Sequence, residues 1–488
     1  MLQHRRTLII ILAALSLVCF YRLRSNSLDY GPPSWTRLSR NDEDVRNSTL
    51  GFAEIFVINL PSRRDRRDAM TMASAVSNLS LTFLDGFTGD DSVPVSSPAG
   101  KNTDTGREGT KPSHSASAGA RGSWRSHMNA MQIIVAKGLG SALVLEDDVN
   151  WDVRLKTQMR TFAKAALMWL DAEEERRKRI PRLRNRKTAE SRRVGRRLEY
   201  SLSEEGEEQD SGAESEIGPG SDADADYRRA IEEGLERDTI PLPPRLLSSE
   251  SKHGMRTASP YGDDWDVLWL GHCGASLPAA QQEPSALRRD QQFSSSLTIS
   301  IPGDMTVPAP QHLKPHPFAL RDELAEAYPP HTRVVHAADG NVCSLAYAVS
   351  QRGARKLLRR VGREGFVDQW DLMLRDICMG GYEGRGRGGG GSDKKDGKEE
   401  KEKERLGEND DGPPVCLTVQ PPLISHHYAG EEGASVSNIR GQGGGFARGR
   451  KGTPYVRLGV QENLRRLVAG VPVHRLVDQL PDDGDPIW

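Results

Sequence analysis

The stretch SALVLEDDV, residues 141–149, is an apolar run that ends in three acidic residues. Such a run is typical of a buried strand that carries carboxylates to the edge of a sheet, where ligands usually bind in α/β proteins. Because side chains alternate along a strand, we expect Glu146 and Asp148 on one face and Asp147 on the other. Two acids on one face can hold a hard divalent cation. Helix capping or turn chemistry is the alternative interpretation of the same pattern.

Further strand-like and helical segments alternate along the chain. Apolar runs at 54–60, 266–271, 343–350 and 415–420 predict strands. Residues 123–138 and 351–361 have helical spacing, and 366–378 predicts a helix over its second half. This alternation predicts an α/β fold built on a largely buried sheet.

Composition limits the class of protein and its partners. The chain has 488 residues and a formal net charge of −1, which argues against nucleic-acid binding. Charged residues are concentrated at 172–262. The stretch 380–412 is rich first in glycine and then in Lys and Glu. We interpret these two stretches as disordered surface insertions, because they carry too few apolar residues to fold alone.

The N-terminus predicts entry into the secretory pathway. The predicted anchor, residues 7–24, consists of an uncharged apolar run at 7–21 with basic residues on both sides. A short tail at 1–6 precedes it, and a polar stem at 25–53 follows it. We expect an uncleaved signal anchor that makes a single-pass type II membrane protein of the endoplasmic reticulum or Golgi lumen. A cleaved signal peptide, which would give a secreted protein, is the alternative. The sequons at Asn47 and Asn78 agree with either location.

Three other groups of residues carry possible chemistry. Arginines at 63–67 follow the first strand and can bind phosphate, or they form a solvated basic turn. His426 and His427 follow the last strand and can complete a metal site, or lie at the surface. Asp368 and Asp371 would share one face of a helix, where one can act as a general base or simply favour the helix N-terminus.

The cysteines suggest cross-links. Outside the apolar N-terminal segment they number four, which allows one or two disulfides in an oxidising compartment. Cys378 and Cys416 flank the second insertion, and we expect them to pair first.

Taken in order, these segments resemble glycosyltransferase family 25, the group that contains collagen β-galactosyltransferases and bacterial lipooligosaccharide galactosyltransferases. The resemblance covers about 150 residues of the region 54–440 and rests on several short motifs together. They are FVINLPSRRDRR (56–67), ARGSWRSHMNAMQ (120–132), ALVLEDDVNWD (142–152), WDVLWLGHCG (265–274), LAYAVSQRGARKLL (345–358), VDQWDLMLRDIC (367–378) and VQPPLISHH (419–427).

The resemblance implies a GT-A-like catalytic domain over 54–488, a nucleotide-diphospho-sugar donor and Mn²⁺ or another divalent cation. It implies that Asp148 holds the metal with Glu146, or with Asp147 in its place. It places His426 or His427 near the metal or the diphosphate, and Asp371 or Asp368 as the acceptor-side base. The implied donor-binding residues are Asn59, Arg63, Arg66, Arg67, Arg121, His127 and Asp147.

We therefore expect a metal-dependent glycosyltransferase that moves a sugar, galactose by family, from a UDP-sugar to a hydroxyl of a glycan or glycoprotein, with inversion. Its other partner would be the membrane, through the N-terminal anchor. Two alternatives are a lumenal metal-dependent hydrolase that uses the same acids, and a non-catalytic protein that binds sugar nucleotides.

Overall fold

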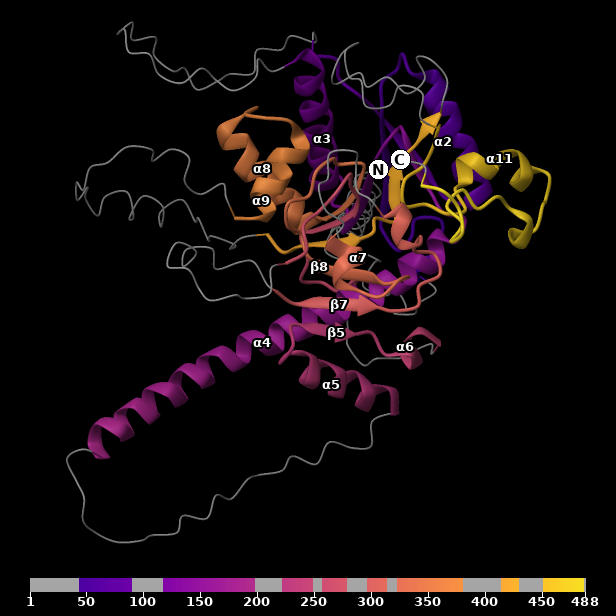
Figure 1. Cartoon of the computed structure of the whole chain (residues 1–488). Helices are drawn as coiled ribbons and strands as arrows, with labels where there is room; N and C mark the ends of the chain where they lie inside the picture. The colour runs from indigo at the N-terminus through magenta and orange to yellow at the C-terminus, as the bar shows by residue number, and fades with distance from the viewer. Residues whose placement is uncertain are drawn as a thin grey trace, which may run out of the picture.

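The computed structural model describes residues 44–89, 117–197, 222–248, 257–278, 296–313, 323–380, 414–429 and 451–486. Nine strands within these ranges form one mixed sheet in the middle of the molecule (Figure 1). Their order is β2 (Leu81–Asp85), β1 (Glu54–Asn59), β3 (Ser141–Glu146), β9 (Ala346–Ser350), β6 (Val267–Gly271), β10 (Cys416–Gln420), β8 (Arg333–Ala337), β7 (Thr298–Ile301) and β5 (Thr239–Pro241). This architecture confirms the predicted α/β class.

Strand direction decides which residues meet at one edge. β1 pairs in parallel with β2 and β3, and β6 pairs in parallel with β10. β9 runs antiparallel to both β3 and β6, so these two strands point the same way. The carboxyl ends of β1, β2, β3, β6 and β10 therefore lie along a single edge of the sheet.

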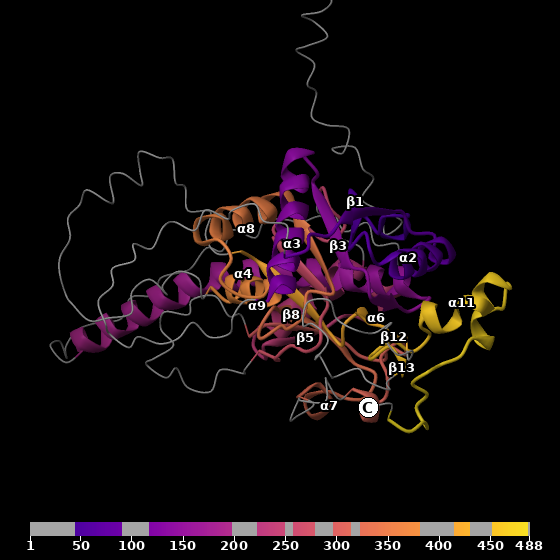
Figure 2. The same ribbon diagram turned by 90° about the horizontal axis from the view of Figure 1, so that it is seen from above.

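Helices cover both faces of the sheet. They are α2 (Arg64–Ser77), α3 (Ala118–Ala136), α4 (Leu155–Arg197), α5 (Asp222–Gly234), α6 (Pro244–Ser248), α7 (Glu323–Ala327), α8 (Gln351–Glu364), α9 (Trp370–Cys378) and α11 (Val460–Val468), with short 3₁₀ turns at Asp44–Arg46, Pro310–His312 and Val473–Arg475. Figure 2 shows α3, α8 and α9 grouped together, while α2 lies beside α11 at one end of the molecule.

Successive side chains of β1 and β3 point to opposite faces of the sheet, so these strands contribute to a separate core on each face. Ile55 and Leu143 are buried in the core that includes Phe162 of α4. Their neighbours Phe56 and Val144 are buried in a second core with residues of α3, α8 and α9. Because both faces of β1 and β3 are covered, these strands are apolar along nearly their whole length.

Two short strand pairs extend the structure beyond the edge of the sheet. β4 (Val149–Trp151) follows the acidic motif directly and pairs antiparallel with β11 (Ile424–His426), in a register that places Val149 opposite His426. β12 (Tyr428–Ala429) pairs with β13 (Lys451–Gly452). The β4–β11 pair brings the segment that follows β10 back to the acidic motif.

The structure differs from the predicted domain boundaries in two places. Residues 44–53, which we assigned to the stem, belong to the core, because Val45, Leu50 and Phe52 are buried there. The segment 172–262 is not wholly a disordered insertion, since α4 continues to Arg197 and the segment also holds α5, β5 and α6. Ile231 and Ile240 are buried, so a few apolar side chains anchor a segment whose composition is mostly charged.

The predicted tail and anchor, and nearly all of the predicted insertion at 380–412, lie outside the described residues. Within the described ranges, no helix is both long enough and apolar enough to cross a membrane.

Disulfides join Cys378 to Cys416, as predicted, and Cys273 to Cys343. Disulfides are typical of extracellular and lumenal proteins. The sequon residues Asn47 and Asn78 are exposed.

Candidate functional site

The acidic motif lies at the carboxyl edge of the sheet, as predicted, but its side chains do not alternate as predicted. β3 ends at Glu146, and Asp147 and Asp148 form the turn that leads to β4. Because strand alternation stops with the strand, Asp147 and Asp148 both reach the same arginine instead of facing opposite sides.

That arginine is Arg66, in the first turn of α2. Its Nη1 lies 2.7 Å from Asp147 Oδ1 and 2.9 Å from Asp148 Oδ2. Asn59, the last residue of β1, donates from Nδ2 to Asp147 Oδ2 at 2.7 Å. The loop after β1 therefore does meet the acidic motif, and it places a fixed positive charge on the two acids.

The charges at this point set the ionisation of Asp148. Burial raises the pKa of Asp148, but the positive charge of Arg66 and the interaction with His426 outweigh it and hold the pKa well below its usual range. Burial and the charge of Asp148 raise the pKa of Asp147, against the opposing effect of Arg66. Asp148 is therefore ionised at every physiological pH.

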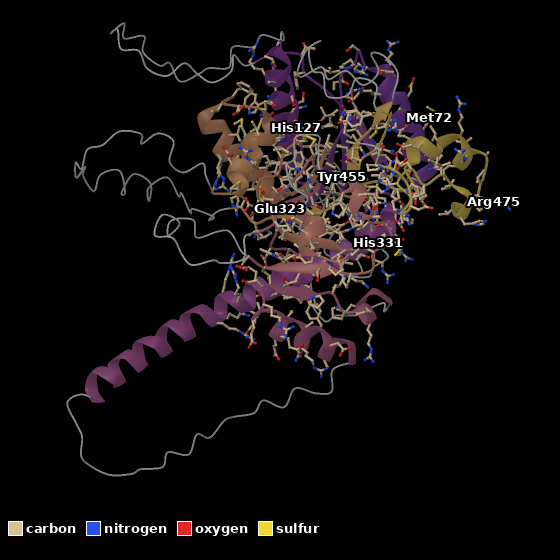
Figure 3. The ribbon with its side chains drawn as sticks, viewed as in Figure 1. Met72, His127, Glu323, His331, Tyr455 and Arg475 are labelled. Carbon is tan, nitrogen blue, oxygen red and sulfur yellow. A yellow bond between two sulfur atoms is a disulfide. The ribbon has the colours of Figure 1, made fainter. Side chains whose placement is uncertain are left out.

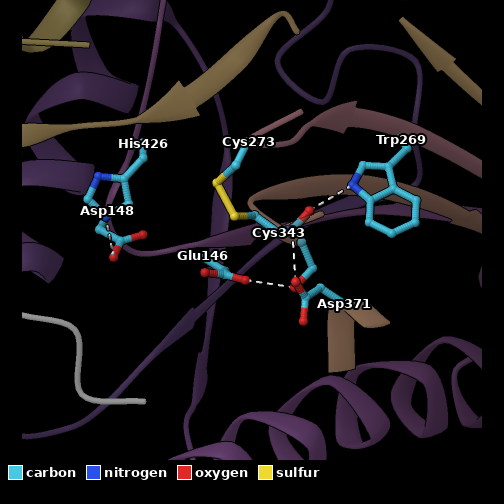
Figure 4. The surroundings of a disulfide bond; sticks show 8 residues. Glu146, Asp148, Trp269, Cys273, Cys343, Asp371 and His426 are labelled. Atoms are coloured by element: carbon cyan, nitrogen blue, oxygen red, sulfur yellow. Dashed lines mark hydrogen bonds and ion pairs between the residues drawn. A yellow bond between two sulfur atoms is a disulfide. The ribbon is translucent and has the colours of Figure 1, made fainter. Parts of the chain in front are cut away.

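His426 completes this side of the site. The β4–β11 pairing places its Nε2 3.3 Å from Asp148 Oδ2 (Figure 4). Asp148 Oδ1 and His426 Nδ1 are buried and have no hydrogen-bond partner within the described residues. Two neighbouring side chains of metal-ligating types thus each keep one buried polar atom without a hydrogen-bond partner among the described residues.

His427 does not join its neighbour. Its Nδ1 lies 3.1 Å from Thr453 Oγ1 and 3.3 Å from Glu462 Oε1. His427 comes after the end of β11, and its side chain points to Thr453 and Glu462 rather than to Asp148. The structure selects His426.

Glu146 occupies the centre of the site. Burial and the charge of Asp148 raise the pKa of Glu146 to about 8, and Ser344 Oγ donates to its Oε1 at 2.8 Å. Without a bound cation, this carboxyl group keeps its proton at neutral pH. Figure 4 shows Glu146 between Asp148 and Asp371, and the charges of both acids contribute to the raised pKa.

His127 of α3 is buried in the interior of the protein (Figure 3). Its Nδ1 is 2.8 Å from the Tyr347 hydroxyl, its ring stacks on Trp370 at 5.4 Å, and its Nε2 is 3.7 Å from Glu146 Oε1. Burial lowers the pKa of His127 to about 3, so the imidazole is neutral. His127 therefore lies in the core next to Glu146, and its predicted contact with the donor stays a prediction.

Asp371 and Asp368 differ, contrary to the expectation of a common helix face. α9 begins at Trp370, so Asp368 precedes the helix, where it is exposed and accepts a hydrogen bond from the Gln369 amide. Asp371 lies in the first turn and accepts from the Cys343 amide at 2.8 Å through Oδ2 (Figure 4). The structure brings Asp371 to the site and leaves Asp368 outside this group.

The other predicted arginines have different surroundings. Arg63 pairs with Asp65, and Arg67 lies over the Phe83 ring at 4.4 Å from its centroid. Arg121 is exposed on α3. Arg66 is thus the arginine of the predicted cluster that is seen to bind both Asp147 and Asp148.

Several residues of the site were not predicted. They are Cys343, Ser344, Tyr347, Trp370 and the disulfide partner Cys273, which surround Glu146 and Asp371. All lie within or beside the quoted motifs, but their roles depend on pairing between distant segments.

The described residues alone offer a metal an incomplete set of ligands here. The described residues contain no group of three or more His, Cys, Asp or Glu side chains arranged to hold an ion. Asp148 Oδ1 and His426 nevertheless fit a cation that takes its other ligands from a diphosphate and water, because such cations often use one or two protein ligands in nucleotide sites.

Comparisons with known proteins agree with this geometry. Residues 52–195, which include β1, β3 and the acidic motif, match glycosyltransferase family 25 (LPS biosynthesis protein). The predicted resemblance is confirmed. The match ends before α9 and β11, so Asp371 and His426 lie beyond it.

Three relatives with names from this family or from procollagen galactosylation are each 29% identical to a part of this chain. A bovine protein named probable inactive glycosyltransferase 25 family member 3 is 29% identical over 143 residues, which is 29% of this chain and 24% of the relative. The human inactive glycosyltransferase 25 family member 3 is 29% identical over 160 residues, 31% and 26% of the two chains. Mouse procollagen galactosyltransferase 2 is 29% identical over 126 residues, 25% and 20% of the two chains. The matched part therefore spans about a quarter of the length of these relatives or less.

Proposed function

We propose that the protein is a glycosyltransferase that moves a hexose, galactose first among candidates, from a UDP-sugar to a hydroxyl of a glycan or glycoprotein. The observation that carries the proposal is the buried group at the carboxyl edge of the sheet. There an ionised Asp148 with an unpartnered oxygen lies between Arg66 and His426. This edge is the usual ligand-binding position in α/β sheets.

The residues present fit the charge changes of such a reaction. Arg66 supplies a fixed positive charge, and Asp148 Oδ1 and His426 would hold a divalent cation. When bound, that cation would stabilise negative charge on the diphosphate leaving group. Preorganised charge of this kind is usually the largest contribution to catalysis.

Asp371 is our proposed general base. Glu146 separates it from Asp148, so the acceptor would meet Asp371 on the side away from the leaving group (Figure 4). A carboxylate in that place can take the proton of the attacking hydroxyl. Attack from the opposite side in one displacement gives inversion.

The test is Asp148→Asn in the full chain, with UDP release from UDP-galactose measured in the presence of Mn²⁺ and an acceptor glycan. We expect turnover to fall on the order of 10²- to 10³-fold, by analogy with loss of one preorganised electrostatic group. Glu54→Gln is the matched control. Glu54 is a carboxylate at the start of β1, at the edge of the sheet opposite the site, and it pairs with Lys137. Equal turnover in Asp148→Asn and Glu54→Gln would reject the assignment.

A second candidate is suggested by the names of two of these relatives, which include the word inactive. The protein would then bind a sugar nucleotide without transferring the sugar. A thermal-shift titration with UDP-sugar and Mn²⁺ shows whether the protein binds the donor at all, since a ligand that binds only the folded state raises Tm. A product assay then separates transfer from binding alone. Stabilisation by UDP-sugar and Mn²⁺ together without any product would favour binding alone. Product formed with water as the only acceptor would favour a hydrolase.

We also propose that the protein works in the lumen of the endoplasmic reticulum or Golgi. The two disulfides among the described residues and the exposed sequon asparagines support an oxidising compartment. Endoglycosidase sensitivity of the expressed full chain tests this location.

A further inference from the structure

A short segment, Cys343–Leu345, contacts two acids of the candidate site, Glu146 and Asp371. The Cys343 amide donates to Asp371 Oδ2 at 2.8 Å, and Ser344 Oγ donates to Glu146 Oε1 at 2.8 Å. The Leu345 carbonyl accepts from the Glu146 amide at 3.0 Å. The position of this segment therefore determines where both carboxyl groups lie.

The backbone at Cys343 is held in a conformation that it would not adopt freely. Its φ is 64°, in the left-handed region that is unfavourable for residues with a Cβ atom. Trp269 Nε1 donates to the Cys343 carbonyl at 3.0 Å, and the side chain is covalently joined to Cys273. Contacts on both sides of the residue thus fix the direction of its amide (Figure 4).

The Cys273–Cys343 disulfide is not needed to keep its two segments, near residues 273 and 342, side by side. The Cys273 amide donates to the Val342 carbonyl at 2.8 Å, and the Val342 amide donates to the Gly274 carbonyl at 3.1 Å. These bonds would remain after the cross-link is cut. The disulfide therefore acts mainly on Cys343, the residue after Val342. Without the cross-link, we expect the backbone of Cys343 to relax.

We propose that the Cys273–Cys343 disulfide is a positioning element for Asp371, because it fixes the Cys343 peptide whose N–H holds the Asp371 carboxylate. The proposal rests on the proposed transferase function. It makes Cys343 a positioning residue, while Asp371 remains the group that meets the acceptor.

The chain offers a matched pair of variants. Cys273→Ser cuts this disulfide and leaves Cys343 unchanged. Cys378→Ser cuts the other disulfide, which joins the far end of the same helix, α9, to β10. Each variant leaves one free thiol. Cys273→Ser frees the residue whose amide binds Asp371 at the start of α9, whereas Cys378→Ser removes the covalent link at the end of α9.

We expect Cys273→Ser to lower kcat on the order of 10- to 100-fold, because small misplacements of a reacting group cost rate steeply. The KM for the donor should stay within about twofold, since Arg66 and Asp148 are untouched. Cys378→Ser should lower Tm and leave kcat within about twofold of the unmodified protein. Unchanged kcat in Cys273→Ser would overturn the proposal.

A double-mutant cycle distinguishes positioning from a general loss of stability. In an Asp371→Asn background, Cys273→Ser should reduce the residual rate by less than about threefold, because coupled residues are not additive. If Cys273→Ser reduces the rate by the same factor in both backgrounds, the disulfide does not act through Asp371 and the proposal is wrong.

Amide hydrogen exchange at Cys343 gives a readout that does not depend on activity. We expect the Cys343 amide to exchange at least about tenfold faster in Cys273→Ser, and at an unchanged rate in Cys378→Ser. If the unmodified protein shows no transfer with any UDP-sugar, the proposed function fails, and this measurement alone decides the inference. Equal protection of Cys343 in both variants would overturn it.

Discussion

At the scale of single residues, Arg66 is the side chain on which the acidic motif depends. It contacts both Asp147 and Asp148, and the three side chains are 9–15% exposed. We expect Arg66→Met to lower the free energy of unfolding by about 3 kcal/mol, because buried carboxylates would lose their counter-charge. Denaturant unfolding measures the change. Added Mn²⁺ should recover part of the lost stability if it takes over the charge of the guanidinium group.

The control for this variant lies two residues earlier in the same helix. Arg64→Met removes an exposed arginine from α2 and should change stability by less than about 0.5 kcal/mol. If Arg66→Met and Arg64→Met unfold at the same denaturant concentration, Arg66 does not neutralise the acids.

At the scale of secondary-structure elements, the site depends on how closely β11 lies against β6. Gly271 ends β6, and a Cβ atom there would lie 2.8 Å from the Ile424 carbonyl oxygen and 2.8 Å from Ala346 Cβ. We expect Gly271→Ala to push β11 outward and separate His426 from Asp148. The thermal shift produced by UDP-galactose with Mn²⁺ should then shrink, and stability should fall by about 1–3 kcal/mol.

Gly140→Ala provides the comparison, because a Cβ atom there meets nothing within 4 Å. It should leave both Tm and the ligand-induced shift unchanged. A full ligand-induced shift in Gly271→Ala would mean that the approach of β11 does not build the site.

At the scale of the whole molecule, buried neutral histidines make stability depend on pH. His336 Nδ1 donates to the Ala337 carbonyl at 2.7 Å, and Gln420 donates to His336 Nε2 at 3.0 Å. Burial lowers the pKa of His336 from 6.5 to about 4. Between these two pH values the unfolded chain binds a proton that the folded protein does not, so this contribution to stability falls with falling pH.

The expected loss from His336 is about 2 kcal/mol between pH 6.5 and about pH 5, at about 1.4 kcal/mol per pH unit. His336→Gln should therefore lose less stability over this interval than the unmodified protein, as measured by Tm at each pH. His474→Gln, which alters an exposed histidine, should follow the unmodified protein. Parallel curves for His336→Gln and the unmodified protein would contradict the prediction.

Local patterns in the sequence were enough to predict the sheet, the acids at its edge and the Cys378–Cys416 disulfide. Apolar runs identify buried strands because burial is a property of each segment, and the residues that come directly after a strand lie at an edge of the sheet. The helix that holds Asp371 was likewise predicted over the correct half of its segment. By contrast, composition misled us at 172–262, where Ile231 and Ile240 anchor a charged segment.

The sequence by itself determined that carboxylates would end a buried strand, since hydrophobic periodicity within a few residues is enough to show it. Only the tertiary structure decided which partners they meet. The choice of Arg66 among the arginines, of His426 over His427 and of Asp371 over Asp368 depends on contacts between segments far apart in the chain. Such contacts are fixed by strand register and helix start, where a shift of one residue turns a side chain to the other face.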